Sequence, residues 1–249
     1  MARLPALRSR RQAHSRCLQL ALPDGVLRSN GETDASAIAV TRHVEWVLEL
    51  LAEIGGHRHR VEDRTAGMWG ATSRGRLVVT THHGNWIVGA RALVERLGPI
   101  HTVAGVQLRG GWSDSVADHL ARQGVHLTDV FGLRRTLRAG GTVVLHLDGQ
   151  TGPHRGRSHP IGVVAAARLA VWERPEIFAA RCVLAGPGSF VLEGVPLGLA
   201  QRGEEGDVPS TFSSWEHRFT RLLQDWVAGD PGGWMLFSPR HLAFAEVGR

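Results

Sequence analysis

Short apolar segments alternate with amphipathic segments over most of the chain, and this alternation constrains the fold more than any other feature of the sequence. Strand-like runs such as "RLVVTT", "HTVAGVQ" and "TVVLHL" stand between segments with helical spacing, such as "NWIVGARALVERLG". Strands that alternate with helices form a mainly parallel sheet, because each helix carries the chain back across the sheet. We therefore predict an α/β fold in which helices cover a mainly parallel central sheet.

The chain divides into an N-terminal extension and one larger unit. Residues 1–33 mix Arg, Pro, Ser and Gly without sustained periodicity, which predicts a partly ordered extension. Asp34 or Ser36 is predicted to cap a long helix that ends at a Gly-Gly pair. Further on, "EIFAARCVLAG" and "SFVLEGVPLG" are typical of two strands joined by a Gly-Pro-Gly turn. No repeat or second boundary interrupts the pattern, so residues 34–249 are predicted to form a single α/β domain.

The composition limits the location and the partners of the protein. All 29 basic residues are arginine, and the formal net charge of the 249-residue chain is +6. This surplus suits an acidic partner, such as a carrier protein, a phosphate-bearing thioester, nucleic acid or an anionic membrane surface, without choosing among them. No apolar run has the length of a signal peptide or a membrane span, so we expect no secretion and no integral membrane segment, while peripheral membrane contact stays open. Cys17 and Cys182 are too few for a disulfide framework, and we therefore expect a cytoplasmic protein.

Two polar segments follow predicted strands at their carboxyl ends, where open α/β sheets bind their ligands. In the first, "TTHHGNW", His82 and His83 leave a strand just before a helix begins, a pattern that is equally typical of a simple turn. The positive end of that helix should lower the pKa of a histidine and favour the neutral imidazole that a general base needs. Backbone N–H groups and the side-chain amide of Asn85 would then stabilise an oxyanion. In the second, "VVLHLDGQ", Asp148 stands where a carboxylate would orient a histidine, bind a cation or cap the next segment.

Three segments, taken in order, resemble one known group of enzymes. "LVVTTHHGNW", "LRRTLRAGGTVVLHLDGQ" and "DPGGWMLF" are similar to the lysophospholipid acyltransferase superfamily, specifically its bacterial lipid A lauroyl/myristoyl acyltransferase branch, from about residue 38 to residue 238. The resemblance implies an acyltransferase-like fold, with His82 removing a proton from an acceptor that attacks an acyl thioester. The thioester is a co-substrate, so no cofactor is expected. The resemblance also implies substrate contacts for the rest of the motif: His83, Gly84, Trp86 and Ile87.

The sequence departs from this family at the acid of the motif. The family has Asp or Glu after four intervening residues, but Ile87 stands at that place, and reading from His83 gives Val88. Asp148 is our first choice to orient His82 instead, because it ends a strand on the same face of the sheet. Alternatively, a more nucleophilic acceptor such as an amine, hydroxylamine or hydrazine reacts without the acid, or the chain binds an acyl group without turning it over.

A second departure concerns the acceptor and the donor. The membrane helix usual in the lipid A branch is not expected here, which implies a soluble acceptor rather than a membrane lipid. We therefore expect acyl transfer from a carrier-protein or coenzyme A thioester to a soluble amine or hydroxyl, in a secondary-metabolite pathway. Arg134 and Arg135 are candidates to meet the acidic face of a carrier protein or its phosphopantetheine phosphate, although a solvated helix face is the plainer account. Gln150, in the loop after Asp148, is a further candidate for substrate contact.

Two other classes of function compete with acyl transfer. His82, His83, His146 and Asp148 could gather into the metal centre of a hydrolase, and His146 and Asp148 alternate with Leu147 so that both point to one sheet face. No remaining spacing matches a known metal motif. Nucleic-acid binding would use the positive charge, but arginine is spread along the whole chain and no nucleic-acid-binding motif is visible, so we expect no such partner.

Overall fold

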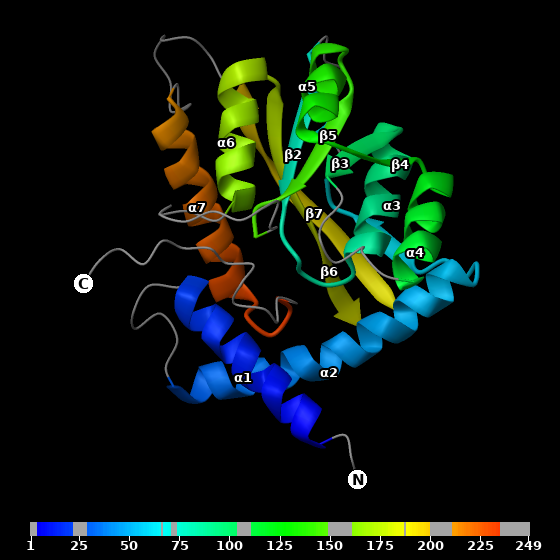
Figure 1. Cartoon of the computed structure of the whole chain (residues 1–249), viewed down its shortest axis with the longest axis vertical. Helices are drawn as coiled ribbons and strands as arrows, with labels where there is room; N and C mark the ends of the chain where they lie inside the picture. Colours follow the sequence, from blue (N-terminus) through cyan, green and yellow to red (C-terminus); the bar gives the residue numbers. More distant parts are fainter. Residues whose placement is uncertain are drawn as a thin grey trace.

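A single mixed sheet stands at the centre of the computed structural model of the chain (Figure 1). Its strands are β1 (Arg60–Asp63), β2 (Arg76–Thr80), β3 (Ile100–Val103), β4 (Val125–Thr128), β5 (Thr142–His146), β6 (Glu176–Gly186) and β7 (Ser189–Leu199). Their order in the sheet is β1-β7-β6-β2-β5-β3-β4. The structure describes residues 4–21, 29–65, 67–70, 74–103, 111–148, 161–186, 188–199 and 211–234.

The strands are parallel to their neighbours except for β6 and β7, which form an antiparallel hairpin. The mainly parallel sheet and the hairpin predicted from the sequence are therefore confirmed. β1 has no counterpart among the predicted strands, because its four residues bury only Val61, and that only partly. It forms by pairing in parallel with β7, a contact that hydrophobic periodicity does not reveal.

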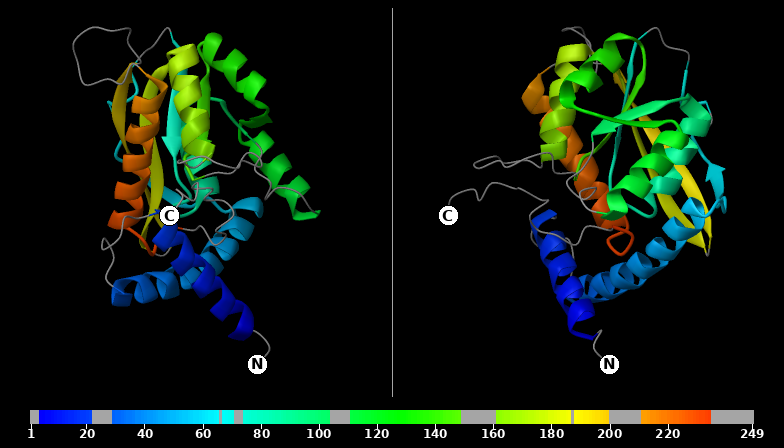
Figure 2. Two further views of the ribbon diagram at one scale, coloured as in Figure 1. Left: turned by 60° about the vertical axis from the view of Figure 1, so that its left-hand side comes forward. Right: turned by 45° about the vertical axis from the view of Figure 1, so that its right-hand side comes forward.

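Two layers of helices cover the sheet (Figure 2). The helices are α1 (Leu4–Ala21), α2 (Ser29–Ile54), α3 (Trp86–Leu97), α4 (Gly111–Arg122), α5 (Val130–Arg138), α6 (Ile161–Glu173) and α7 (Phe212–Gly229). α5, α6 and α7 share a core with one face of the sheet, and α3 and α4 share a second core with the other face. No helix in the described part of the chain is long and apolar enough to cross a lipid bilayer.

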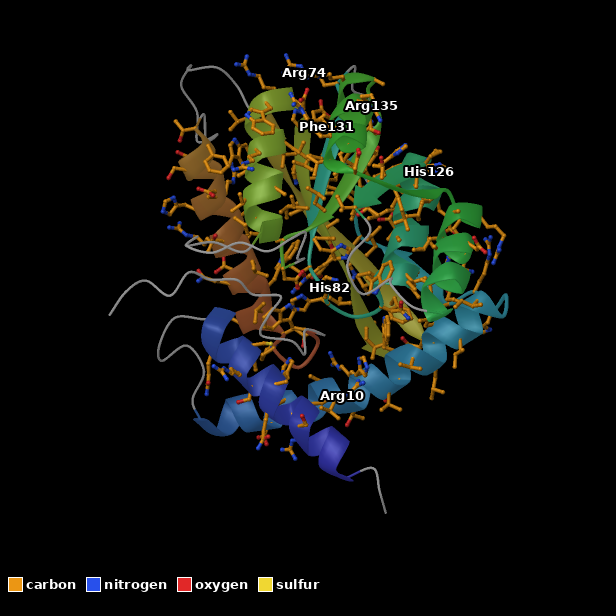
Figure 3. The ribbon with its side chains drawn as sticks, in the orientation of Figure 1. Arg10, Arg74, His82, His126, Phe131 and Arg135 are labelled. Atoms are coloured by element: carbon orange, nitrogen blue, oxygen red, sulfur yellow. The ribbon has the colours of Figure 1, made fainter. Side chains whose placement is uncertain are left out.

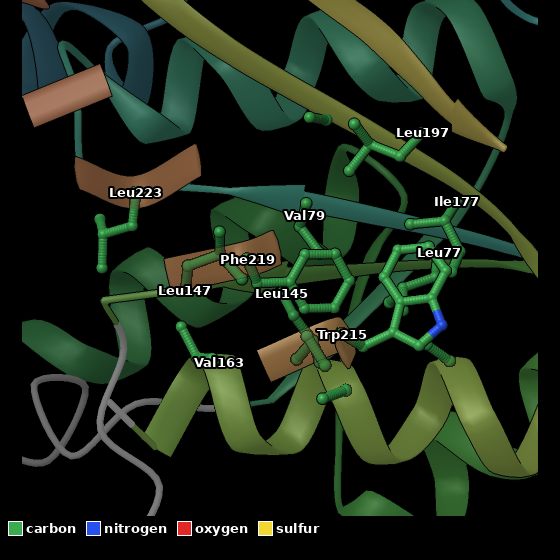
Figure 4. Close-up of a cluster of buried hydrophobic side chains, with 14 of the residues drawn as sticks. Leu77, Val79, Leu145, Leu147, Val163, Ile177, Leu197, Trp215, Phe219 and Leu223 are labelled. Atoms are coloured by element: carbon green, nitrogen blue, oxygen red, sulfur yellow. The ribbon is translucent and has the colours of Figure 1, made fainter. Parts of the chain in front are cut away.

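Alternation along the strands produces the two cores. Leu77 and Val79 of β2 pack toward α6 and α7, whereas Val78 between them packs toward α3. Figure 4 shows the first core, in which Trp215 and Phe219 of α7 lie over the side chains of β2 and β5. Strands that are buried on both faces give continuous apolar runs, which is why β2 and β5 can be recognised in the sequence.

The segment predicted as a partly ordered extension, residues 1–33, contains an ordered helix instead. α1 crosses α2 at one end of the molecule (Figures 1 and 2) and buries His14, Cys17 and Leu18. Those residues have the i, i+3, i+4 spacing of one helix face, but the stripe is narrow and exposed arginines surround it, so the pattern is weak in the sequence. Packing against the rest of the protein stabilises such a helix. α2 likewise begins before its predicted cap, at Ser29.

Candidate active site

The carboxyl ends of β2 and β5 bring the two polar segments together. These strands are adjacent and parallel, and Thr80 at the end of β2 is in register with His146 at the end of β5. The backbone N–H of Leu147 also donates to the carbonyl of Thr80 at 2.7 Å, so the two segments stay side by side beyond the strands. His82 and Asp148 therefore leave the same edge of the sheet as neighbours.

His82 and Asp148 form a hydrogen-bonded pair at this edge. The distance from His82 Nδ1 to Asp148 Oδ1 is 2.8 Å, and the backbone N–H of His82 donates to Asp148 Oδ2 at 3.0 Å. The side chain of Asp148 is fully buried, whereas that of His82 is 19% exposed. The contact predicted as the first choice, Asp148 with His82, is thus present in the structure.

The charge of Asp148 fixes where His82 carries its proton. Burial by itself would raise the pKa of Asp148, but the charge and hydrogen bond of His82 outweigh burial and hold this pKa well below its usual range. An ionised carboxylate only accepts hydrogen bonds, so Nδ1 of His82 is the donor. In the neutral ring the lone pair is therefore on Nε2, the nitrogen that is not bonded to Asp148.

The pKa of His82 corrects the prediction made from the helix dipole. Burial lowers the pKa of His82. The charge of Asp148 and its hydrogen bond together raise this pKa by more than burial lowers it, so the net shift is upward. The predicted lowering is wrong because a carboxylate in direct contact outweighs the partial charge at the start of α3. A raised pKa makes His82 a stronger base once it has lost its proton.

The ring of His146 stacks on the ring of His82. Their centroids are 4.3 Å apart and their planes differ by 26°, while Trp86 meets His146 edge-on at 6.2 Å. Burial, and then the charge of His82, lowers the pKa of His146 to about 3, so this ring is neutral near neutral pH. The sequence suggested His146 only as a metal ligand, whereas in the structure it supports the ring of His82.

Trp234 is a site residue to which the sequence assigns no role. Its indole N–H donates to Asp148 Oδ2 at 2.6 Å, and the whole residue is buried. It belongs to the "DPGGW" segment after α7, which carries part of the family resemblance, although the resemblance gives the tryptophan no role. This segment contacts the histidine loop, since the N–H of Gly84 donates to the carbonyl of Gly233 at 3.1 Å and Trp234 forms an isolated β-bridge with His83.

His83 and Gly84 shape the loop around His82. Gly84 has a φ of 57°, and a Cβ at this position would lie 2.4 Å from the carbonyl oxygen of Cys182, so the site requires glycine. His83 Nδ1 lies 2.6 Å from the hydroxyl of Thr81. Burial, and then the charge of Arg181, lowers the pKa of His83 to about 4. His83 and Gly84, both predicted to contact substrate, make these contacts within the protein, and His83 also lines a cavity between α3 and the sheet.

Asn85 caps α3 rather than facing a substrate. Its side-chain oxygen accepts hydrogen bonds from the backbone N–H groups of Ile87 at 3.1 Å and Val88 at 3.3 Å. Its amide group donates to Glu49 Oε2 at 3.3 Å. These helix N–H groups were predicted to stabilise an oxyanion together with Asn85, and the cap corrects that prediction because it already bonds them to the asparagine.

Ile87 occupies the position where the family resemblance expects an acid. Its side chain is fully buried, in the core that also contains Phe178 and Ile100. The predicted substrate contact at Ile87 is therefore corrected to a core contact. The first turn of α3 directs this residue into the protein, so position 87 does not face His82 as Asp148 does.

An apolar cavity lies next to the pair, between α3 and the sheet. It has a volume of about 40 Å³, and its lining includes Trp86 and His146, the latter in contact with His82. Half of the remaining lining is aliphatic, and the other half includes three threonines, His83 and Arg181; the aliphatic residues are Ala90, Leu93, Ile100, Val125, Val144, Ala180 and Leu192. Such a surface favours hydrocarbon over a charged group. Trp86, predicted to contact substrate, thus lines this cavity, and its contact with a substrate stays a prediction.

Arg134 and Arg135 are not brought to this site. Arg134 forms an ion pair with Glu173 at the end of α6 and lies over the ring of Trp172 at 4.9 Å. Figure 3 shows Arg135 near the top of the molecule and His82 well below it. Gln150, the other predicted substrate contact, lies outside the described residues.

The histidines of the site do not gather around a common point. His83 is bonded to Thr81, while His146 is stacked on His82. Within the described ranges, no group of three His, Cys, Asp or Glu side chains is arranged to hold a metal ion.

No protein-family model matches the sequence, and no curated protein matches it. The chemistry of the site is therefore inferred from the residues of this chain.

Proposed function

We propose that the protein is an acyltransferase that moves an acyl group from a thioester to a soluble amine or hydroxyl. One observation carries the proposal: a buried, ionised Asp148 bonds Nδ1 of His82 beside an apolar cavity. The carboxylate orients the imidazole and stabilises its charged form, as in a Ser-His-Asp triad. The cavity, of about 40 Å³, supplies an apolar surface for a short part of an acyl chain next to this base.

His82 acts as the general base in the proposed reaction. Nε2 accepts the proton of the acceptor N–H or O–H while the acceptor lone pair attacks the thioester carbonyl carbon. The tetrahedral intermediate then breaks its C–S bond, and the imidazolium gives the proton to the departing thiolate. The products are an amide or ester and a free thiol, and His82 is neutral again. Asp148 stays ionised throughout.

Asp148 supports the proposal where the sequence departs from the lysophospholipid acyltransferase pattern. The resemblance expects the acid on the helix after the histidine, where Ile87 stands, but here the carboxylate follows β5. A carboxylate at Nδ1 orients a histidine base and stabilises its charged form, whichever segment of the chain provides it. We therefore propose a divergent member of that superfamily in which Asp148 takes the role of the motif acid.

The proposed donor is a carrier-protein or coenzyme A thioester. Both donors carry phosphate, which suits the net charge of +6. Such thioesters are cytoplasmic metabolites, so the proposal also places the protein in the cytoplasm. Cys17 and Cys182 are both free and buried, which fits a reducing compartment.

Intact-protein mass spectrometry of an acyl-loaded carrier protein tests the proposal. The carrier, or acyl-coenzyme A in a parallel series, is incubated with the protein and a panel of soluble amines and alcohols. We expect loss of the acyl group from the donor and an acylated product with one class of acceptor. His82→Ala should abolish the transfer, and His126→Ala should retain it, because His126 lies exposed on β4. Equal turnover by His82→Ala, or no product with any acceptor, would contradict the proposal.

A further inference from the structure

We infer that Trp234 is a positioning residue that holds Asp148 in the orientation in which it supports His82. This inference rests on the proposed role of His82 as a base. No group of the substrate needs to touch Trp234, because its effect passes through the carboxylate.

Three donors fix the carboxylate of Asp148. Oδ1 faces Nδ1 of His82 at 2.8 Å, and Oδ2 accepts from the backbone N–H of His82 at 3.0 Å and from the indole N–H of Trp234 at 2.6 Å. Two donors therefore come from one residue, and Trp234 supplies the third from a distant part of the sequence. Without the indole N–H, Oδ2 of this fully buried carboxylate would accept only the hydrogen bond from the backbone N–H of His82.

Trp234 is itself held from three directions. The carbonyl of Trp234 lies 2.8 Å from Nε2 of His14 on α1, and Nδ1 of the same histidine lies 3.1 Å from the hydroxyl of Ser36 on α2. The β-bridge with His83 ties it to the histidine loop, and its ring is part of the core under α6 and α7. A side chain anchored in this way can fix the direction of the carboxylate rather than follow it.

The other titratable groups that face Asp148 among the described residues, His83, His146 and Cys17, leave this role to Trp234; His83 is neutral because burial, and then the charge of Arg181, lowers its pKa to about 4. His146 is neutral because burial, and then the charge of His82, lowers its pKa to about 3. Cys17 of α1 is also neutral, because burial, followed by the charge of Asp148, raises its pKa to about 12. Among the described residues, the hydrogen-bond donors to Asp148 are thus His82 and Trp234.

Trp234→Phe separates the hydrogen bond from the packing of the ring. Phe keeps an aromatic ring and the backbone contacts but removes the N–H. The more basic carboxylate should then hold the imidazolium more tightly, so the pKa of His82 should rise. Trp215→Phe is the matched control, because Trp215 is equally buried in the same core and its indole N–H bonds to none of the described residues.

The pKa of His82, followed by nuclear magnetic resonance of its ring protons, is the readout that a purely structural role would not change. We expect it to rise in Trp234→Phe and to stay at the wild-type value in Trp215→Phe. In acyl transfer, the acidic limb of the pH profile of kcat/KM should move to higher pH together with the pKa of His82. The value of kcat should fall about tenfold, the effect of losing one hydrogen bond to a charged group. A wild-type pKa and pH profile in folded Trp234→Phe would overturn the inference.

A measurement on the unaltered side chain guards against a variant that does not fold. In the wild-type protein, the indole N–H resonance of Trp234 should lie downfield and should shift in Asp148→Asn, whereas that of Trp215 should not. An unchanged Trp234 resonance would overturn the inference. These resonance experiments need no substrate, so they test the role of Trp234 separately from the proposed acyl transfer. If no acyl donor is consumed, the proposed function is wrong, but the resonance shifts still show whether Trp234 positions Asp148.

Discussion

The rings of His82 and His146 stack at a centroid separation of 4.3 Å, at the ends of two adjacent parallel strands. The stack joins a histidine with a raised pKa to one whose pKa is lowered to about 3. His146 therefore stays neutral while His82 gains and loses a proton, and it offers the ring of His82 a flat, uncharged surface. This arrangement follows from the register of β2 and β5, which puts Thr80 opposite His146.

The stack predicts a difference between two substitutions of His146. His146→Phe keeps a flat ring and should leave kcat within about threefold of the wild type, whereas His146→Ala should lower it about tenfold, the range expected for one aromatic contact. Steady-state acyl-transfer kinetics would measure both. His101→Ala is the control, because His101 pairs with His126 on β3 and β4 rather than with His82. Equal rates for the Phe and Ala variants would show that the ring of His146 has no role.

Asp148→Asn should remove most of the activity. The amide keeps the size of the side chain but not its charge, so Nδ1 of His82 loses the acceptor that fixes its tautomer, and kcat should fall by about 10³ to 10⁴. The charge of Asp148 also raises the pKa of His82, so the acidic limb of the pH–rate profile should move to lower pH in this variant. Asp118→Asn, on the exposed face of α4, should change neither quantity. A limb that stays in place would contradict the assignment of His82 as the group that titrates.

The sequence predicts the pair of His82 and Asp148 because each residue ends a strand that is recognisable by its apolar run. Parallel strands share one carboxyl edge, so two polar strand ends have a high chance of meeting. Trp234 and His14 are not predictable in this way. They come from opposite parts of the chain and reach the site only through the packing of α1 and the segment after α7.

Asn85 shows a different reason for failure. A polar residue at a strand-to-helix junction is equally suited to binding an oxyanion and to capping the helix, and the two uses need the same side chain. In the structure Asn85 caps the helix, because the N–H groups of Ile87 and Val88 donate to the asparagine oxygen. The pKa of His82 was mispredicted for a related reason, since the sequence shows the helix end but not the distance to Asp148.

His83 and His146 should make the fold sensitive to acid. Histidine has a reference pKa of 6.5, and burial lowers it to about 4 in His83 and about 3 in His146. At pH values between these and 6.5, the unfolded chain binds protons that the folded chain does not, so the free energy of unfolding falls as the pH falls. The expected slope is about 1.4 kcal/mol per pH unit for each histidine. Urea unfolding at several pH values between about 7 and 5 would measure this slope.

His146→Phe provides the control for this slope. The variant removes one of several histidines whose pKa is lowered by burial, a group that also includes His43 at about 4, so the dependence on pH should be weaker by about 1.4 kcal/mol per unit. His82 acts in the opposite direction at the upper end of this range, because its raised pKa lets the folded chain keep a proton that the unfolded chain loses, and it adds nothing at lower pH, where both states are protonated. An equally steep slope in His146→Phe would mean that this ring is not buried in its neutral form.

Ile87→Glu restores the acid that the acyltransferase motif expects, but it should not improve the site. Ile87 is fully buried in the core beside Phe178, so a glutamate there would leave an unpaired charge in an apolar environment. We expect the free energy of unfolding to fall by about 3–5 kcal/mol, against about 1 kcal/mol for Ile87→Val. Urea unfolding compares the two variants with the wild type. A stable and active Ile87→Glu protein would show instead that position 87 can turn toward His82, and that Asp148 is not its necessary partner.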